Sequence, residues 1–117
     1  MNVDLHYKAD KLREMEKFDE ALRVYDRVIE KYLENKNFAG VADALQGKVL
    51  TYKHLYARKR NEEYLKLATG CAKSSLEIIN KYNIKDMYAS GYFRMGEVYR
   101  LANKYKGATK NFEEAYK

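Results

Sequence analysis

Few side chains in this sequence have the types and spacing that catalysis requires. The 117 residues include two histidines, His6 and His54, and a single cysteine, Cys71. No serine, histidine and aspartate have the spacing of a nucleophile with its base, and no cluster has the spacing of metal ligands. We therefore expect no enzymatic activity, no cofactor and no metal, with both histidines as ordinary surface or groove residues and Cys71 as a buried packing thiol.

Basic side chains are concentrated in one segment of the chain. Residues 37–60 hold five basic side chains and one acidic one, so this segment carries +4 of the net charge of +6. Arg58, Lys59 and Arg60 suit the end of a helix, where the helix dipole favours positive charge even without an acidic partner. The alternative is nucleic-acid binding through this basic helix, helped by exposed tyrosines. The cations are Lys48, Lys53, Arg58, Lys59 and Arg60.

Hydrophobic periodicity predicts that helices position these groups. Apolar and aromatic residues recur at helical spacing from Tyr92 to Tyr99, Asn103 interrupts the pattern, and residues 105–115 resume it. Two helices joined by so short a break fold back as a hairpin. Glycine costs a helix about 1 kcal/mol, so Gly96 is expected where a neighbouring backbone comes too close for a side chain.

The same reading applied to the whole chain predicts an all-α domain of about six helices. These helices form three hairpins, at approximately residues 2–36, 37–83 and 85–117. The middle hairpin is elongated, and Asn61 is expected to cap its second helix. A run of small residues at 68–72 is expected to let two helices approach closely. Tyrosines assigned to the core or its edge are Tyr25, Tyr92, Tyr99 and Tyr105.

The order of large, small and aromatic residues in 92–117 resembles the tetratricopeptide repeat (TPR) family. Residues 17–22 are similar to the opening of the family's second helix, and Ala9, Gly47 and Gly96 stand at the small position. The steps between these small residues, 38 and 49 positions, exceed the family's usual 34, and the chain has no proline. The resemblance implies a right-handed superhelical solenoid whose concave groove binds a protein or peptide segment.

The family's groove positions, carried onto this sequence, give a groove of mixed character. Arg13, Lys48 and Arg100 would hold acidic groups of the partner, and Tyr52 and Phe93 would provide apolar anchors. The family's clamp for the carboxylate of chaperone tails is matched only by Arg94, so that ligand is not expected. The implied groove set is Val3, His6, Asp10, Arg13, Val41, Ala44, Lys48, Thr51, Tyr52, Ser90, Phe93, Glu97 and Arg100.

Composition and chain ends complete these expectations. The chain is 46% hydrophobic and 34% charged, which suits a folded domain. No segment approaches the ~18 apolar residues that cross a membrane, and no secretion signal opens the chain, so we expect a cytoplasmic protein without a membrane partner. The apolar pattern still runs at Lys117 without a polar capping helix. This favours the amino-terminal part of a longer array, or self-association through the C-terminal helix.

Overall fold

The computed structural model describes the backbone of residues 2–117 and the side chains from Asp4 onward. This part of the chain contains six α-helices, a 3₁₀ turn at Lys85–Met87 and no strand, so the prediction of an all-α chain is confirmed. The side chain of Val3, expected in the groove, lies outside the described residues. The helices are α1 (Asn2–Glu14), α2 (Phe18–Glu34), α3 (Phe38–Lys59), α4 (Glu62–Lys81), α5 (Tyr88–Leu101) and α6 (Tyr105–Ala115).

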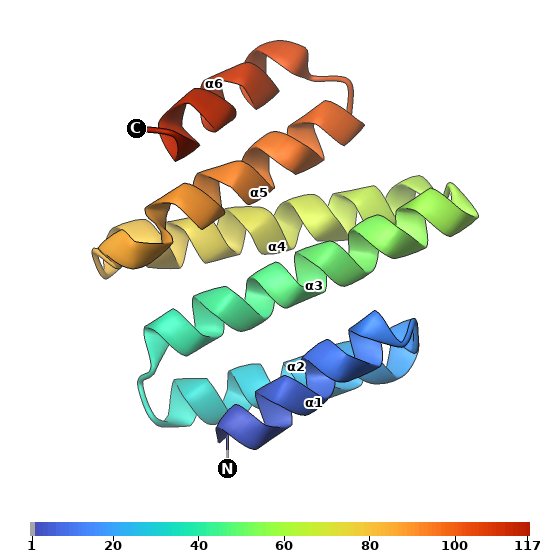
Figure 1. Cartoon of the computed structure of the whole chain (residues 1–117), viewed down its shortest axis with the longest axis vertical. Coiled ribbons are helices and arrows are strands. Elements are labelled where there is room, and N and C mark those ends of the chain that lie inside the picture. Colours follow the sequence, from blue (N-terminus) through green and yellow to red (C-terminus); the bar gives the residue numbers. More distant parts are fainter. Residues whose placement is uncertain (1) are drawn as a thin grey trace.

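Each helix packs against the next one along the chain, and α3 also contacts α1 and α5 (Figure 1). The molecule measures 40 × 35 × 18 Å. Its shortest dimension has room for about two layers of helices, since a helix with its side chains is about 10 Å across. Figure 1 shows α1 and α3 lying in front of α2 and α4. None of the described helices combines the length and the apolar composition that crossing a bilayer requires.

The helices are separated by tight turns that use neither proline nor glycine. Each of the five turns between α-helices contains one residue in the left-handed backbone region, at Glu16, Lys36, Arg60, Asn83 and Asn103. Side-chain caps begin the two long helices. The Asn37 carboxamide oxygen accepts a hydrogen bond from the Gly40 amide at 2.9 Å, and that of Asn61 accepts one from the Glu63 amide at 3.0 Å. The predicted cap at Asn61 is confirmed.

An aromatic ring lies against each of the two glycines that stand at the small positions of the predicted repeats, Gly47 and Gly96. A Cβ atom added at Gly47 would lie 2.5 Å from the ring of Tyr25 on α2. One added at Gly96 would lie 2.5 Å from the ring of Phe112 on α6. The expected close approach is therefore present, but a side-chain ring makes it rather than a neighbouring backbone. Tyr25 is completely buried, as expected. The contact between its ring and Gly47 therefore closes the core between α2 and α3.

One expectation about packing holds only in part and another is wrong. Gly70 has no atom within 4 Å of the place where its Cβ would be, so this part of the 68–72 run does not serve helix approach, although Ala68 and Ala72 are fully buried. Tyr105 is 63% exposed and does not belong to the core or its edge. It is the first residue of α6, and the buried side of that helix is provided further on, by Ala108 and Ala115.

Candidate functional site

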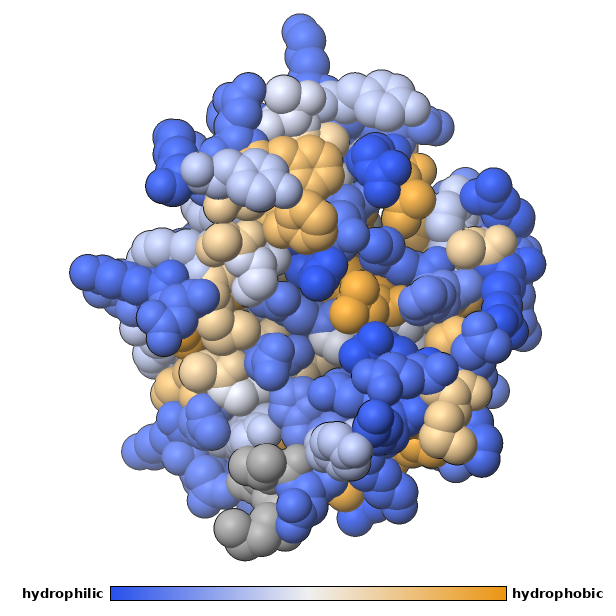
Figure 2. All heavy atoms as spheres, viewed as in Figure 1, coloured by the Kyte–Doolittle hydropathy of each residue, from blue (hydrophilic) through white to orange (hydrophobic). Residues whose placement is uncertain are grey.

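One face of the molecule, formed by α1, α3 and α5, carries a small polar hollow of about 110 Å³. Three alternate helices of the chain each contribute side chains to it, although they are far apart in sequence. Figure 2 shows this side of the molecule as largely hydrophilic, with apolar atoms gathered over α5 and α6. The residues that line the polar hollow are His6, Asp10, Arg13, Asp43, Gln46, Gly47, Leu50 and Arg94.

The α1 side of the polar hollow is anchored to the core by Tyr25. Its hydroxyl donates a hydrogen bond to Asp10 Oδ1 at 2.5 Å and accepts one from Arg13 Nε at 3.0 Å. Burial raises the pKa of Tyr25 well above that of an exposed tyrosine, and the hydrogen bond to the Asp10 carboxylate raises it further. The hydroxyl therefore keeps its proton, and it fixes a carboxylate and a guanidinium side by side at the rim.

His6 joins three helices at the same end of the hollow. Its side chain is 11% exposed, and its Nδ1 atom lies in hydrogen-bond contact with Tyr32 Oη on α2, at 2.9 Å. Its Nε2 atom lies 3.9 Å from Asp10 Oδ1 and 3.8 Å from Asp43 Oδ2. The imidazole thus stands between one carboxylate on α1 and one on α3. When protonated, it forms an ion pair with each of them.

The α5 side is built around Glu97. One carboxylate oxygen accepts a hydrogen bond from Arg94 Nη1 at 2.5 Å, and the other accepts one from Lys53 Nζ at 2.7 Å. Next to them, Gln46 Nε2 donates to Ser90 Oγ at 3.1 Å. The Nε atom of Arg94 is buried and has no hydrogen-bond partner among the described residues. A buried donor without an acceptor is costly, so an acceptor that reached this N–H would remove an unfavourable feature of the unbound protein.

The structure does not bring the six principal groove residues together. Arg13 lines the polar hollow. Glu97 accepts hydrogen bonds from Lys53 and Arg94 on the α5 side of the hollow. Phe93 packs on the Phe112 ring with centroids 5.4 Å apart and lines a second groove of about 250 Å³ between α5 and α6, which shares Arg94 with the polar hollow. Arg100 is exposed at the end of α5.

Lys48 and Tyr52 lie on the opposite side of α3 from the hollow. The ammonium group of Lys48 forms an ion pair with Asp26 of α2 at 2.7 Å, and the Tyr52 ring stacks near that of Tyr64 on α4, at 6.4 Å. At about 100° per residue, each of these two residues lies roughly 160° from Leu50 around the helix. The expectation that they share one groove with Arg13 is therefore corrected.

The basic segment at 48–60 does not form one continuous patch. Lys53 faces α5 and is paired with Glu97. Arg58 is paired with Glu16 at 2.5 Å, in the turn between α1 and α2. Lys48 is paired with Asp26 as described above, the Arg60 guanidinium lies over the Tyr56 ring at 5.6 Å, and Lys59 is exposed. Three of the five cations are thus locally neutralised, on different sides of α3.

The sequence predicted the α1 part of the hollow and misplaced the α3 part. His6, Asp10 and Arg13 were expected in the groove and line the hollow. On α3 the observed residues are Asp43, Gln46, Gly47 and Leu50, whereas Val41, Ala44 and Thr51 are almost completely buried. In the sequence, the face of α3 that lines the hollow is marked by two polar residues three positions apart, Asp43 and Gln46.

The remaining chemically distinctive side chain, Cys71, lies away from the hollow on α4. It is half-buried, and this burial raises the pKa of its thiol above the ordinary value. At neutral pH the group is a thiol, which suits a packing role. Between Asp4 and Lys117, the structure contains no group of three or more His, Cys, Asp or Glu side chains arranged to hold a metal ion.

Comparison of the chain with models of known protein families gave no match. Comparisons with curated protein sequences and with solved structures gave no significant match either.

Proposed function

We propose that this chain is a protein-interaction module of the TPR type that binds a segment of a protein partner across the face formed by α1, α3 and α5. The fold expectation behind this proposal is a right-handed solenoid of three helix pairs. It is supported by the packing of each helix on the next and by aromatic rings that fill the spaces at Gly47 and Gly96. The polar hollow lies where alternate helices meet, which is the place that such a module offers to a partner.

The observation that carries the proposal is the unpartnered Nε–H of Arg94. This atom is buried, the Arg94 side chain lines the hollow together with Gln46, and the same guanidinium is fixed through Nη1 to Glu97. A peptide carbonyl or an acidic side chain in the hollow would accept this hydrogen bond, and Arg13 would add a second cation from α1. Asp43, which is 64% exposed, offers an acceptor to a backbone N–H of the same segment. The expected partner therefore has an acidic group near a free backbone amide.

Affinity selection from a displayed library of random peptides provides the test. Peptides selected on the unaltered protein should lose at least tenfold in affinity for the Arg94→Gln variant, because truncating one member of a buried, charged hydrogen bond costs about 2 kcal/mol or more. Fluorescence anisotropy with labelled peptides measures this loss. The fold should survive, because Lys53 remains paired with Glu97 at 2.7 Å after the substitution.

The matched control is Arg23→Gln, the same substitution on the exposed surface of α2. It should change affinity by less than twofold. If the selected peptides bind Arg94→Gln and Arg23→Gln equally well, the polar hollow is not the binding site. Melting temperatures of both variants, expected to be close to that of the parent chain, separate lost binding from lost folding.

The two alternative functions make different predictions in the same assay. Nucleic-acid binding through residues 48–60 would be insensitive to Arg94→Gln and would weaken steeply with salt. The structure gives it little support, because Lys48, Lys53 and Arg58 are each paired with a carboxylate. Self-association through α6 would appear as a concentration-dependent mass in sedimentation, without any peptide.

A further inference from the structure

The unequal lengths of neighbouring hairpins leave a notch on the other side of the molecule. Helix α4 has 20 residues and α5 has 14, which correspond to about 30 Å and about 21 Å. The first turns of α4 therefore extend past the turn that joins α5 to α6 (Figure 1). A space of about 340 Å³ lies in this step. We call it the lysine notch, and it is lined by Glu62, Leu65, Lys66, Thr69, Gly70, Lys73, Ala102 and Lys104.

The corresponding step on the other side of the long hairpin, at the same end of it, is filled by the chain itself. There the last turns of α3 extend past the turn between α1 and α2. His54 stacks on Phe18 with centroids 5.7 Å apart, and Arg58 forms an ion pair with Glu16. No hydrogen bond, ion pair or ring contact of this kind joins the first turns of α4 to the α5–α6 turn among the described side chains. The lysine notch is therefore open, whereas the equivalent space beside the α1–α2 turn is filled by side chains.

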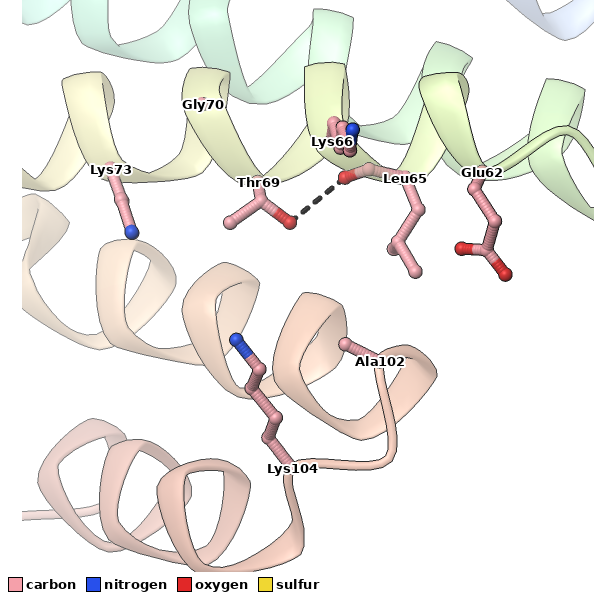
Figure 3. Close-up of a pocket in the computed structure, with 8 residues that line it drawn as sticks. All are labelled: Glu62, Leu65, Lys66, Thr69, Gly70, Lys73, Ala102 and Lys104. Atoms are coloured by element: carbon pink, nitrogen blue, oxygen red, sulfur yellow. Dashed lines mark hydrogen bonds between the residues drawn. The ribbon is translucent and has the colours of Figure 1, made fainter.

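The charge of the lysine notch is strongly one-sided. Lys66 and Lys73 on α4 and Lys104 in the α5–α6 turn line it, against a single carboxylate, that of Glu62. None of the three ammonium groups forms an ion pair with a described carboxylate. Figure 3 shows the side chains of Lys73 and Lys104 extending toward one another from α4 and from the turn. Like charges that face each other across a gap are stabilised by an anion placed between them.

Gly70 gives the notch its depth. It is the glycine whose added Cβ would meet no atom within 4 Å, and it lies between Lys66 and Lys73 on the same face of α4. Glycine in a helix is unfavourable by about 1 kcal/mol relative to alanine, and no packing contact with the described residues explains it here. A bound chain could approach the helix backbone at Gly70 and place an acidic side chain near each lysine. The Thr69 hydroxyl is already used, since it donates to the Leu65 carbonyl at 2.8 Å (Figure 3).

We propose that the lysine notch binds an acidic peptide segment of a protein partner, through carboxylates that reach Lys66, Lys73 and Lys104. Leu65 and Ala102 provide an apolar floor, which suits a peptide more than a bare ion. The lining includes no aromatic side chain on which a nucleic-acid base would stack and no arginine to hold a phosphate through two hydrogen bonds. This site shares no residue with the polar hollow, so it is independent of the function proposed above.

The test uses a fluorescein-labelled peptide that contains adjacent glutamates and leucines, measured by anisotropy at physiological ionic strength. The Lys66→Glu, Lys73→Glu double variant should bind it at least tenfold more weakly. Gly70→Leu should weaken binding to a similar extent, although it changes no charge, because its side chain fills the notch. Gly70→Leu has open space around it and introduces a good helix former, so its melting temperature should not fall.

Two controls make the result specific. The Lys31→Glu, Lys110→Glu double variant carries the same change of charge on α2 and α6 and should change affinity by less than twofold. Arg94→Gln, which alters the polar hollow, should have no effect. A peptide of the same length with glutamines in place of glutamates should not bind.

Three results would overturn the proposal. The first is binding that survives Gly70→Leu, and the second is binding lost equally in the Lys31→Glu, Lys110→Glu control. The third is tighter binding of a phosphoserine peptide, inorganic phosphate or a labelled single-stranded oligonucleotide, with the same dependence on Lys66 and Lys73. That result would assign the notch to phosphate groups rather than to carboxylates.

Discussion

Tyr25→Ala is expected to lower the free energy of unfolding by about 3–5 kcal/mol, the range found when a large buried aromatic side chain is removed. The Tyr25 ring is completely buried and lies against Gly47, which has no side chain to fill the space left behind. For a domain of this size the melting temperature should fall by more than about 10 °C. Urea unfolding followed by far-ultraviolet circular dichroism measures the change.

Tyr25→Phe separates the ring from its hydroxyl. This variant keeps the packing and loses the hydrogen bonds to Asp10 at 2.5 Å and from Arg13 at 3.0 Å. Its cost should be roughly 1 kcal/mol, because both partners still reach each other and water. If Tyr25→Ala costs no more than Tyr25→Phe, the ring does not hold α1, α2 and α3 together in the way described here. Should Tyr25→Ala fail to fold, Tyr25→Leu gives the same comparison with a smaller cavity.

Two glycine-to-alanine substitutions, one in α3 and one in α4, are expected to have opposite effects on the stability of the protein. Gly47→Ala adds a methyl group 2.5 Å from a ring that is fixed by Asp10 and Arg13. Overpacking of this kind costs about 1–3 kcal/mol, which outweighs the gain in helix propensity. Gly70→Ala adds the same group where no atom lies within 4 Å, so it should stabilise the protein by about 0.5–1 kcal/mol.

Thermal unfolding of both glycine variants beside the parent chain provides the measurement. The melting temperature should fall for Gly47→Ala and rise for Gly70→Ala. A rise for both would mean that the Tyr25 ring moves aside easily, so that the contact at Gly47 does not position the α1 end of the polar hollow. A fall for both would mean that α4 packs more closely around Gly70 than the structure shows.

Much of the fold could be predicted from the sequence because its signals are local. Helical periodicity and side-chain caps operate within a few residues, which is why Asn61 was assigned as the cap of α4. Burial was also predictable for residues on helices that have a single apolar face. Ala9 and Tyr25 are examples, and both are completely buried. These assignments required no knowledge of how the helix pairs are placed in space.

The candidate site was harder to predict because α3 is surrounded. It packs against α1, α2, α4 and α5, so buried residues such as Val41 and Val49 occur around most of its circumference. Periodicity then does not indicate which polar residues face the hollow, and Lys48 was assigned to the wrong side. The ion pairs that neutralise the basic segment join residues far apart in sequence. The pair between Lys53 and Glu97, 44 positions apart, leaves no local trace.

The lysine notch was also invisible in the sequence. The run at 68–72 looks like a contact surface for another helix, and Ala68 and Ala72 serve that purpose. Gly70 faces the opposite way, into a step that exists only because α4 is longer than α5. The relation between hairpin lengths, and not the composition of the run, determines its role.

The most direct test of the central claim is the footprint of a selected peptide on this 13.8 kDa chain, measured by the shifts of backbone amide signals in nuclear magnetic resonance. The proposed function predicts the largest shifts around the polar hollow, in His6 to Arg13, Asp43 to Leu50 and Ser90 to Glu97, together with a shift of the Arg94 Nε–H signal. Shifts confined to α2, α4 and α6, with the Arg94 signal unchanged, would contradict the claim that the α1, α3 and α5 face binds the partner.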